Sequence, residues 1–418
     1  MKNNNNLLLV ESEMNKAKGH FLDYLIETSN YFKNQNNITW FLNENFDHQN
    51  LYLPKYCNIK KIISSNNYKR KDNKFFYFFE EFYFFIKNFF DIFYFIIFFS
   101  NNKNKLLSFL ICLKENYFII PRYFKSFYLE YMKLNYSSND NILFQSCRRK
   151  DIALVYFLSN IEKNNLPKIH LRIFLPPNKR FKDFYFYLNK VYNFLQKKIF
   201  IYTEDGYKKD LISKEIKNDK LVNTTTPIFN FFKRPTTNTK HTIGFIGEAR
   251  ANKGFNDIPN LIILLLKQNI KLNFLIQFSG TNKETEKAAS ILFELSKKND
   301  NIKIVNKYCD YNEYRKLLEK ITLMPLMYDT THMNNTNSGI VYSCISNEII
   351  PIIPPNCEYL KKILATNSYM ESNTLVSYSE NINYIIKNYD KFLFNSKKSS
   401  NNLAKIIHEG AIVSNINL

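Results

Sequence analysis

Short apolar runs alternate with longer amphipathic stretches along most of this 418-residue chain. Leu7 to Val10 is apolar throughout, which is typical of a strand buried on both faces of a parallel sheet. A helical pattern then extends to Phe32, with apolar side chains on one broad face and Asp23 and Glu27 on the other. Ile38 to Leu42 predicts the next strand. A strand, a helix and a strand without hairpin signals between them favour a parallel α/β sheet.

The same alternation returns after residue 140 and again after residue 240. In the first half we expect strands over 142–145, 169–175 and 199–203, with helices over 152–160 and 181–197. In the second half we expect strands over 243–246, 272–278, 302–305, 321–327 and 349–353, with helices over 255–266, 284–298, 310–320, 383–394 and 403–412. A polar stretch, 233–240, separates the halves and predicts a linker between two domains.

These patterns set the expected domain limits. The N-terminal Rossmann-like domain covers 1–229 and includes an aromatic-rich insertion at about 70–135. The linker covers 230–240, the second Rossmann-like domain covers 241–395, and a C-terminal helix and tail cover 396–418.

The aromatic-rich insertion leaves two interpretations open. Phe and Tyr make up 16 of the 25 residues over 75–99, yet the longest uncharged apolar run, 92–99, is far below the roughly 20 residues that span a bilayer. A transmembrane helix is therefore not expected. These residues form core helices of the first domain, or the segment 75–125, with basic residues in its second part, contacts a membrane surface peripherally, and the two interpretations are compatible.

The charge balance restricts the class of partner. Lys and Arg (58) exceed Asp and Glu (37), so the formal charge is +21, which favours anionic ligands. The excess is spread along the chain and no nucleic-acid-binding module is recognised, so we expect no nucleic-acid partner. Six scattered cysteines without a C-x-x-C pair predict free thiols in a reducing compartment. With no signal-peptide core at the N-terminus, we expect a cytoplasmic location, or the inner face of the cell membrane if the insertion contacts lipid.

The strongest candidate for chemistry is the stretch from Thr242 to Phe255. A buried strand ends at Gly247, a loop carries Arg250 and Lys253, and Gly254 is followed by a helical pattern. Backbone amides and the positive end of a helix dipole bind anions, and the two cations indicate a diphosphate. An ordinary strand-to-helix turn with solvated basic residues is the alternative interpretation.

Two further loops lead into helices. Ser338 and Gly339 begin a helical pattern that could hold an anion or a hydroxyl-rich ligand. Gly19 and His20 lie beyond the first strand, where His20 either contacts a substrate or bonds to the helix backbone.

These segments resemble a known family. The run Gly247 to Phe255 resembles the G-x-x-R-x-x-K-G-F variant of nucleotide-sugar-dependent glycosyltransferases of the two-domain GT-B fold, typified by retaining hexosyltransferases. The segment from Tyr328 to Tyr342 resembles the loop and helix that bind the donor in that family, and 351–354 its closing strand. Gly19-His20 resembles the glycine-histidine loop of the acceptor domain.

The resemblance implies an α/β architecture of two Rossmann-like domains with parallel sheets facing across a cleft. It implies that Arg250 and Lys253 hold the donor diphosphate and that His20 lies near the reacting phosphate. No D-x-D pair is present, so no metal and no cofactor are expected apart from the nucleotide-sugar, which is a substrate. The acceptor implied is a glycan or a lipid-linked glycan in cell-surface polysaccharide or glycolipid synthesis. The residues implied in donor binding are Gly19, Gly247, Gly254, Tyr328, Asn334, Ser338, Gly339, Ile340 and Ser343.

Several positions depart from the family pattern, one of them Asn334, which stands where a basic residue is frequent. Ser343 stands where an acid usually accepts hydrogen bonds from the donor ribose, and Glu348 stands where glycine is usual. Two hypotheses follow: a glycosyltransferase, or a catalytically weakened relative that binds a sugar nucleotide or a partner without transfer.

Overall fold

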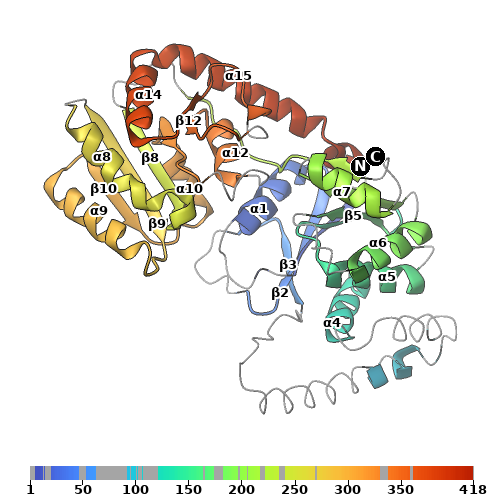
Figure 1. Ribbon diagram of the computed structural model, residues 1–418. Coiled ribbons are helices and arrows are strands. Elements are labelled where there is room, and N and C mark those ends of the chain that lie inside the picture. Colours follow the sequence, from blue (N-terminus) through green and yellow to red (C-terminus); the bar gives the residue numbers. More distant parts are fainter. Residues whose placement is uncertain are drawn as a thin grey trace. The chain divides into compact units, whose positions relative to one another are not determined.

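The chain forms two compact units in the computed structural model (Figure 1). One comprises Met1–Pro227 with Gly410–Leu418, and the other comprises Ile228–Glu409. The structure describes residues 5–12, 14, 20–46, 53–62, 92–94, 96–99, 101, 106, 121–162, 165–173, 182–195, 198–204, 206–216, 222–234, 241–268, 271–329, 338–357 and 361–417. All structural statements below concern these residues.

The first unit is built on a seven-stranded parallel sheet with strand order β3-β2-β1-β4-β5-β6-β7. Its strands are β1 (Asn5–Glu11), β2 (Asn36–Asn43), β3 (Asn58–Ile62), β4 (Asn141–Phe144), β5 (Lys168–Arg172), β6 (Ile199–Thr203) and β7 (Val222–Thr224). Its helices are α1 (His20–Phe32), α4 (Pro121–Met132), α5 (Arg149–Ile161), α6 (Lys182–Leu195), α7 (Gly206–Ile216) and α16 (Ala411–Asn417).

The predicted parallel sheet is confirmed, but its two edge strands, β3 and β7, were not predicted. Only Ile62 is buried within β3, and β7 is three residues long with Val222 as its buried residue. An edge strand pairs with another strand on one side only. It therefore needs no continuous apolar run, and its sequence pattern is weak.

The second unit is a six-stranded sheet, also parallel, with strand order β10-β9-β8-β11-β12-β13. Its strands are β8 (His241–Glu248), β9 (Leu272–Ser279), β10 (Ile302–Asn306), β11 (Leu323–Pro325), β12 (Ile350–Ile353) and β13 (Met370–Glu371). Its helices are the 3-10 turns η2 (Ala251–Lys253) and η3 (Phe255–Asp257), and α8 (Ile258–Leu266), α9 (Glu286–Lys298), α10 (Tyr311–Leu318), α12 (Gly339–Ser346), α14 (Leu375–Lys387) and α15 (Tyr389–His408).

Two helices of the second unit, α10 and α14, begin directly after a residue whose side chain caps the helix. The helix predicted over 310–320 begins at Tyr311, and the carboxylate of Asp310, which precedes it, accepts the Glu313 amide at 2.8 Å in a capping box. The helix predicted over 255–266 begins at Ile258, because the preceding residues form a separate 3-10 turn.

The aromatic-rich insertion is described only in part. Phe99 is buried and packs edge-on against Tyr128 at 5.8 Å between ring centroids, whereas Phe93, Ile97 and Phe98 are exposed. The stretch 63–91, which holds 11 of the 16 Phe and Tyr residues over 75–99, lies outside the described residues. Within the described part of the chain, no helix combines the length and the apolar character needed to cross a membrane.

The last helix, α16, belongs to the first unit, and polar bonds fix it there. The Asn415 amide donates to the Tyr202 hydroxyl at 3.0 Å, and the Asn141 amide donates to the Ile416 carbonyl at 3.4 Å. His170 joins the two anchors, because its Nδ1 lies 2.9 Å from the Tyr202 hydroxyl and its Nε2 lies 2.9 Å from Asn141 Oδ1.

Acid is expected to weaken the first unit through His170. Complete burial lowers the pKa of His170 from 6.5 to about 3. Between pH 6.5 and pH 3, His170 is therefore protonated in the unfolded chain but stays neutral in the folded chain. The free energy of unfolding is therefore unaffected by His170 above pH 6.5 and decreases as the pH falls below this value, by about 2 kcal/mol at pH 5.

The measurement is the change in unfolding free energy between pH 7 and pH 5, compared between the native chain and His170→Gln. Burial raises the pKa of Asp23 to about 7, which acts in the opposite direction, so the difference between the two proteins is the informative quantity. His408→Gln, at an exposed site, is the control and should keep the native pH dependence. An identical pH dependence in His170→Gln would contradict the assignment.

Candidate donor-binding site

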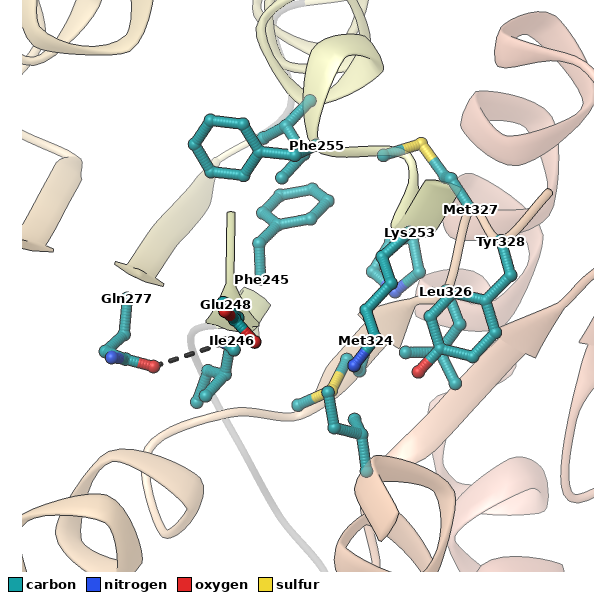
Figure 2. A pocket seen from close by; sticks show the side chains of 14 residues that line it. Phe245, Ile246, Glu248, Lys253, Phe255, Gln277, Met324, Leu326, Met327 and Tyr328 are labelled. Carbon is teal, nitrogen blue, oxygen red and sulfur yellow. Dashed lines mark hydrogen bonds between the residues drawn. The ribbon is translucent and has the colours of Figure 1, made fainter. Parts of the chain in front are cut away.

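The order of the second sheet indicates where a ligand binds. Chain connections run from β8 outward to β9 and β10 on one side, and from β11 to β12 and β13 on the other. In open parallel sheets, ligands bind beyond the carboxyl ends of the strands at such a switch point. A pocket lies at this point between β8 and β11 (Figure 2). Most of the side chains that line it are apolar, Ile340 among them, and Gly247, Glu248, Lys253, Gln277 and Tyr328 also line it.

Two glycines shape the loop that follows β8. Gly247 has φ +135° and donates its amide to Gln277 Oε1 at 3.2 Å. Gly254 has φ +75° between the two 3-10 turns, and a Cβ there would lie 2.2 Å from the Met327 carbonyl oxygen. The Gly254 amide donates to the Ala251 carbonyl at 2.9 Å, so in this state it is not open to a ligand. Both positions therefore need glycine, because a side chain is strained at positive φ and Gly254 has no room for one.

Lys253 projects into the pocket from this loop (Figure 2). Within the described residues its ammonium has no hydrogen bond or ion pair. Burial, and secondarily Arg250, lower its pKa, while Glu248 raises it. A partly buried cation without a partner is unfavourable, so an anion in the pocket would stabilise it.

Arg250 is separated from this pocket. Its guanidinium bonds to the Glu248 carboxylate, with Nε 2.9 Å from Oε2, and both side chains are about half exposed. It lines a second, open cavity together with Asn252, Asn282, Glu284 and Asp329. The structure thus places Lys253 at the pocket and Arg250 beside it, paired with Glu248, which also lines the pocket.

Tyr328 and helix α12 also contribute to the wall of the pocket. The Tyr328 hydroxyl lies 2.8 Å from Ser338 Oγ, which fixes the predicted loop end against the N-terminus of α12. Ile340, from the first turn of this helix, lines the pocket. Ser343 does not line it, because its side chain is buried and its hydroxyl donates to the Gly339 carbonyl at 3.1 Å.

Glu348 has a structural partner. It follows the C-terminus of α12 with φ +53°, the left-handed position where helices usually end in glycine. Its carboxylate accepts the Arg234 backbone amide at 2.7 Å. The buried Arg234 guanidinium donates to the carbonyls of Leu318, Glu319 and Asn347, at the C-terminal ends of α10 and α12, at 2.6, 3.3 and 2.8 Å. A cation at two helix C-termini is favourable, so Glu348 and Arg234 fix the start of the second unit rather than the pocket.

This contact also alters the picture of the linker predicted over 230–240. Asn230 donates to the Tyr311 hydroxyl at 2.6 Å, and Phe229 stacks on Tyr342 at 5.3 Å between ring centroids. The described part of that stretch, up to Arg234, is therefore packed into the second unit.

We expect Arg234→Lys to lower the unfolding free energy by about 2 kcal/mol. A lysine keeps the charge but cannot reach three separate carbonyls, and buried carbonyls without donors are costly. Denaturant unfolding of the full chain measures the change. Lys233→Ala, one residue away and exposed, is the control and should stay within about 0.5 kcal/mol of the native chain. Equal losses in both variants would contradict the anchoring role of the guanidinium.

Several predicted site residues are not placed by the structure. Gly19 and Asn334 lie outside the described residues, and His20 is the first residue of α1 with its side chain also outside them. Conversely, Glu248 and Gln277 line the pocket although no role was predicted for them. Gln277 is the one polar residue in the apolar run 274–278, and this feature of the sequence could have indicated a role for it. Glu248 lies within the motif that resembles the family.

Comparisons with known proteins bear on the fold. No family model matches the sequence, and no curated protein matches it. Solved structures do match over nearly the full length of both chains. A glycosyltransferase from Rickettsia africae has 10% identity and a TM-score of 0.57, and it covers 99% of each chain. HepE from Anabaena, solved with UDP and glucose, has 9% identity and a TM-score of 0.53, covering 99% of this chain and 98% of its own. A UDP-forming α,α-trehalose-phosphate synthase from Burkholderia vietnamiensis has 7% identity and a TM-score of 0.54, with the same coverage.

The chain has the GT-B fold. This confirms the predicted pair of Rossmann-like domains with parallel sheets. In this GT-B chain, the pocket described above occupies the switch point of the C-terminal Rossmann-like unit.

Proposed function

We propose that this GT-B protein is a hexosyltransferase that moves a sugar from a nucleotide-sugar donor to an acceptor. The observation that carries the proposal is Lys253, a partly buried cation that has no hydrogen bond or ion pair among the described residues, at the switch point between β8 and β11. Support comes from the solved relatives: HepE was crystallised with UDP-glucose and with UDP, and the trehalose-phosphate synthase is UDP-forming.

The chemistry follows from the charge at the pocket. When the bond between sugar and diphosphate breaks, negative charge grows on the leaving phosphate, and a fixed cation stabilises that charge. Lys253 supplies it inside the pocket, and Arg250 adds positive potential from beside it. We propose that these cations meet the needs of the leaving group without a divalent metal, and that transfer retains the anomeric configuration, as the resemblance implies.

The acceptor is proposed to be a glycan or a lipid-linked glycan, in the synthesis of a cell-surface polysaccharide or glycolipid. The first unit supports a peripheral membrane location, because Phe93, Ile97 and Phe98 are 45% to 57% exposed. Lys125 lies nearby, with its ammonium 4.0 Å from the Tyr94 ring centroid.

Sedimentation with vesicles of anionic phospholipid tests this location. The double variant Phe93→Gln and Ile97→Gln should weaken binding at least about tenfold, because two inserted apolar side chains are lost. Phe394→Gln is the control: Phe394 is 60% exposed on α15 of the other unit and should not contribute. Equal effects in both proteins, or no vesicle binding by the native chain, would contradict peripheral attachment through this segment.

The function itself is tested with a panel of UDP-, GDP- and ADP-sugars. We expect tight binding of one nucleotide class by calorimetry, together with release of that nucleotide in the presence of sugar acceptors or water. Failure of every nucleotide-sugar to bind would overturn the proposal.

One observation favours a second candidate function, a weakened relative that binds a sugar nucleotide without transfer. The hydroxyl of Ser343 is bonded within its helix, so the usual acid on α12 has no substitute at its own position. Binding without nucleotide release, with or without acceptors, would select this second function.

A further inference from the structure

The polar groups that line the pocket differ in whether their hydrogen-bonding atoms are already paired or remain available to a ligand. Gln277 accepts from Gly247 with its oxygen and donates to the Lys307 carbonyl at 2.8 Å with its nitrogen. The Tyr328 hydroxyl is paired with Ser338. Among the described side chains that line the pocket, Lys253 is then the cation and Glu248 the carboxylate. Figure 2 shows Glu248 and Lys253 entering the pocket from different sides.

One carboxylate oxygen of Glu248 is hydrogen-bonded to Arg250, and the other is available to accept from a ligand. Both bonds from Arg250 reach Oε2, and within the described residues no hydrogen bond is donated to Oε1. A carboxylate oxygen whose partner atom is bonded to a guanidinium remains available as an acceptor. Arg250 also offsets the negative charge of Glu248, so a carboxylate can lie near a bound anion.

The same loop therefore offers two complementary groups. Glu248 ends β8 and Lys253 ends η2, five positions later, with Gly254 fixing the loop against Met327. An ammonium binds phosphate oxygens, whereas a carboxylate accepts hydrogen bonds from hydroxyl groups. A ligand that fits both carries an anion and a pair of neighbouring hydroxyls.

We propose that Glu248 is a specificity-determining residue of the donor site and accepts hydrogen bonds from a vicinal diol of the donor. This inference rests on the proposed function and adds a hydroxyl-reading residue to it. Ser343 is excluded from that role by its buried, helix-bonded hydroxyl. The diol has two sources in a nucleotide-sugar, the ribose and the transferred hexose, and the experiment distinguishes them.

The experiment measures calorimetric dissociation constants for the native chain, Glu248→Gln and Ser343→Ala. The ligands are UDP, GDP and ADP, their 2′,3′-dideoxy analogues, the corresponding glucose nucleotides, and inorganic pyrophosphate. For the nucleotide that binds, Glu248→Gln should weaken the ribonucleotide about 10- to 100-fold, the range for a hydrogen bond to a charged group. The dissociation constant of the dideoxy analogue should change less than about twofold in Glu248→Gln. In Ser343→Ala the dissociation constants of all ligands should stay unchanged.

Pyrophosphate separates hydroxyl recognition from a general charge effect. Removal of a negative charge beside Lys253 leaves pyrophosphate binding equal or tighter in Glu248→Gln. A loss confined to the glucose nucleotides supports the proposal and assigns the diol to the hexose. Equal losses of affinity for ribo- and dideoxynucleotides in Glu248→Gln, or a loss in Ser343→Ala that matches the loss in Glu248→Gln, would overturn it.

Failure of the proposed function gives a different result. In that case the native chain binds no nucleoside diphosphate at all. If the native chain binds one and Lys253→Ala does not, while Glu248→Gln is unchanged on every ligand, the donor site stands and only the role of Glu248 is wrong.

Discussion

Replacement of Lys253 by alanine is expected to lower the rate of nucleotide release from the preferred nucleotide-sugar by about 10²- to 10³-fold. This is the usual effect of removing one group that stabilises developing charge. The free energy of unfolding should change by no more than about 0.5 kcal/mol, because the substitution breaks no hydrogen bond or ion pair of the ammonium among the described residues. Steady-state nucleotide release and thermal unfolding, measured on the same preparation, test both parts.

Two further variants separate the charge of Lys253 from its packing. Lys253→Met keeps an unbranched apolar side chain and should be as inactive as Lys253→Ala, because the ammonium is the functional group. Lys297→Ala is the matched control, since Lys297 is exposed in an ion pair with Glu294 on α9. It should retain native activity. Native turnover by Lys253→Met would assign the effect to the side-chain stem and contradict the electrostatic role.

The predictability of the fold varied with burial. Central strands such as β1, β8 and β9 are built around apolar runs, and they were predicted because burial on both faces leaves few polar positions in them. The edge strands β3 and β7 face solvent along one side and carry polar residues, so their composition did not separate them from loops. The return of α16 to the first unit depends on distant bonds, such as that between Asn415 and Tyr202, which no local pattern encodes.

At the site, the motif located the loop but not the orientation of its side chains. Lys253 was predicted and lines the pocket, whereas Arg250, predicted to share the same ligand, is held by Glu248 beside it. Residue spacing gives no information on this point, because a three-residue 3-10 turn determines where each side chain projects. Glu348 likewise departs from the family pattern, and its partner, Arg234, lies more than a hundred positions earlier in the chain.

Gly254→Ala is the second variant with a large expected effect. The new methyl group would need φ +75°, which costs an L-residue about 1–2 kcal/mol, and it would lie 2.2 Å from the Met327 carbonyl oxygen. Backbone cannot move aside as a flexible side chain does, so the loop or the end of β11 has to shift. With the usual cost of overpacking added, we expect a loss of about 3 kcal/mol in unfolding free energy. Because Lys253 is the preceding residue, nucleotide binding should weaken at least about tenfold as well.

The matched control is Gly280→Ala. Gly280 also has positive φ, +69°, at the end of β9, but a Cβ there meets no atom within 4 Å. This variant carries the conformational cost alone, about 1 kcal/mol, and should bind nucleotide normally. The difference between the two alanine variants therefore measures the contact between Gly254 and Met327. If both lose the same stability and both bind nucleotide, that contact does not position Lys253, and the pocket tolerates a displaced loop.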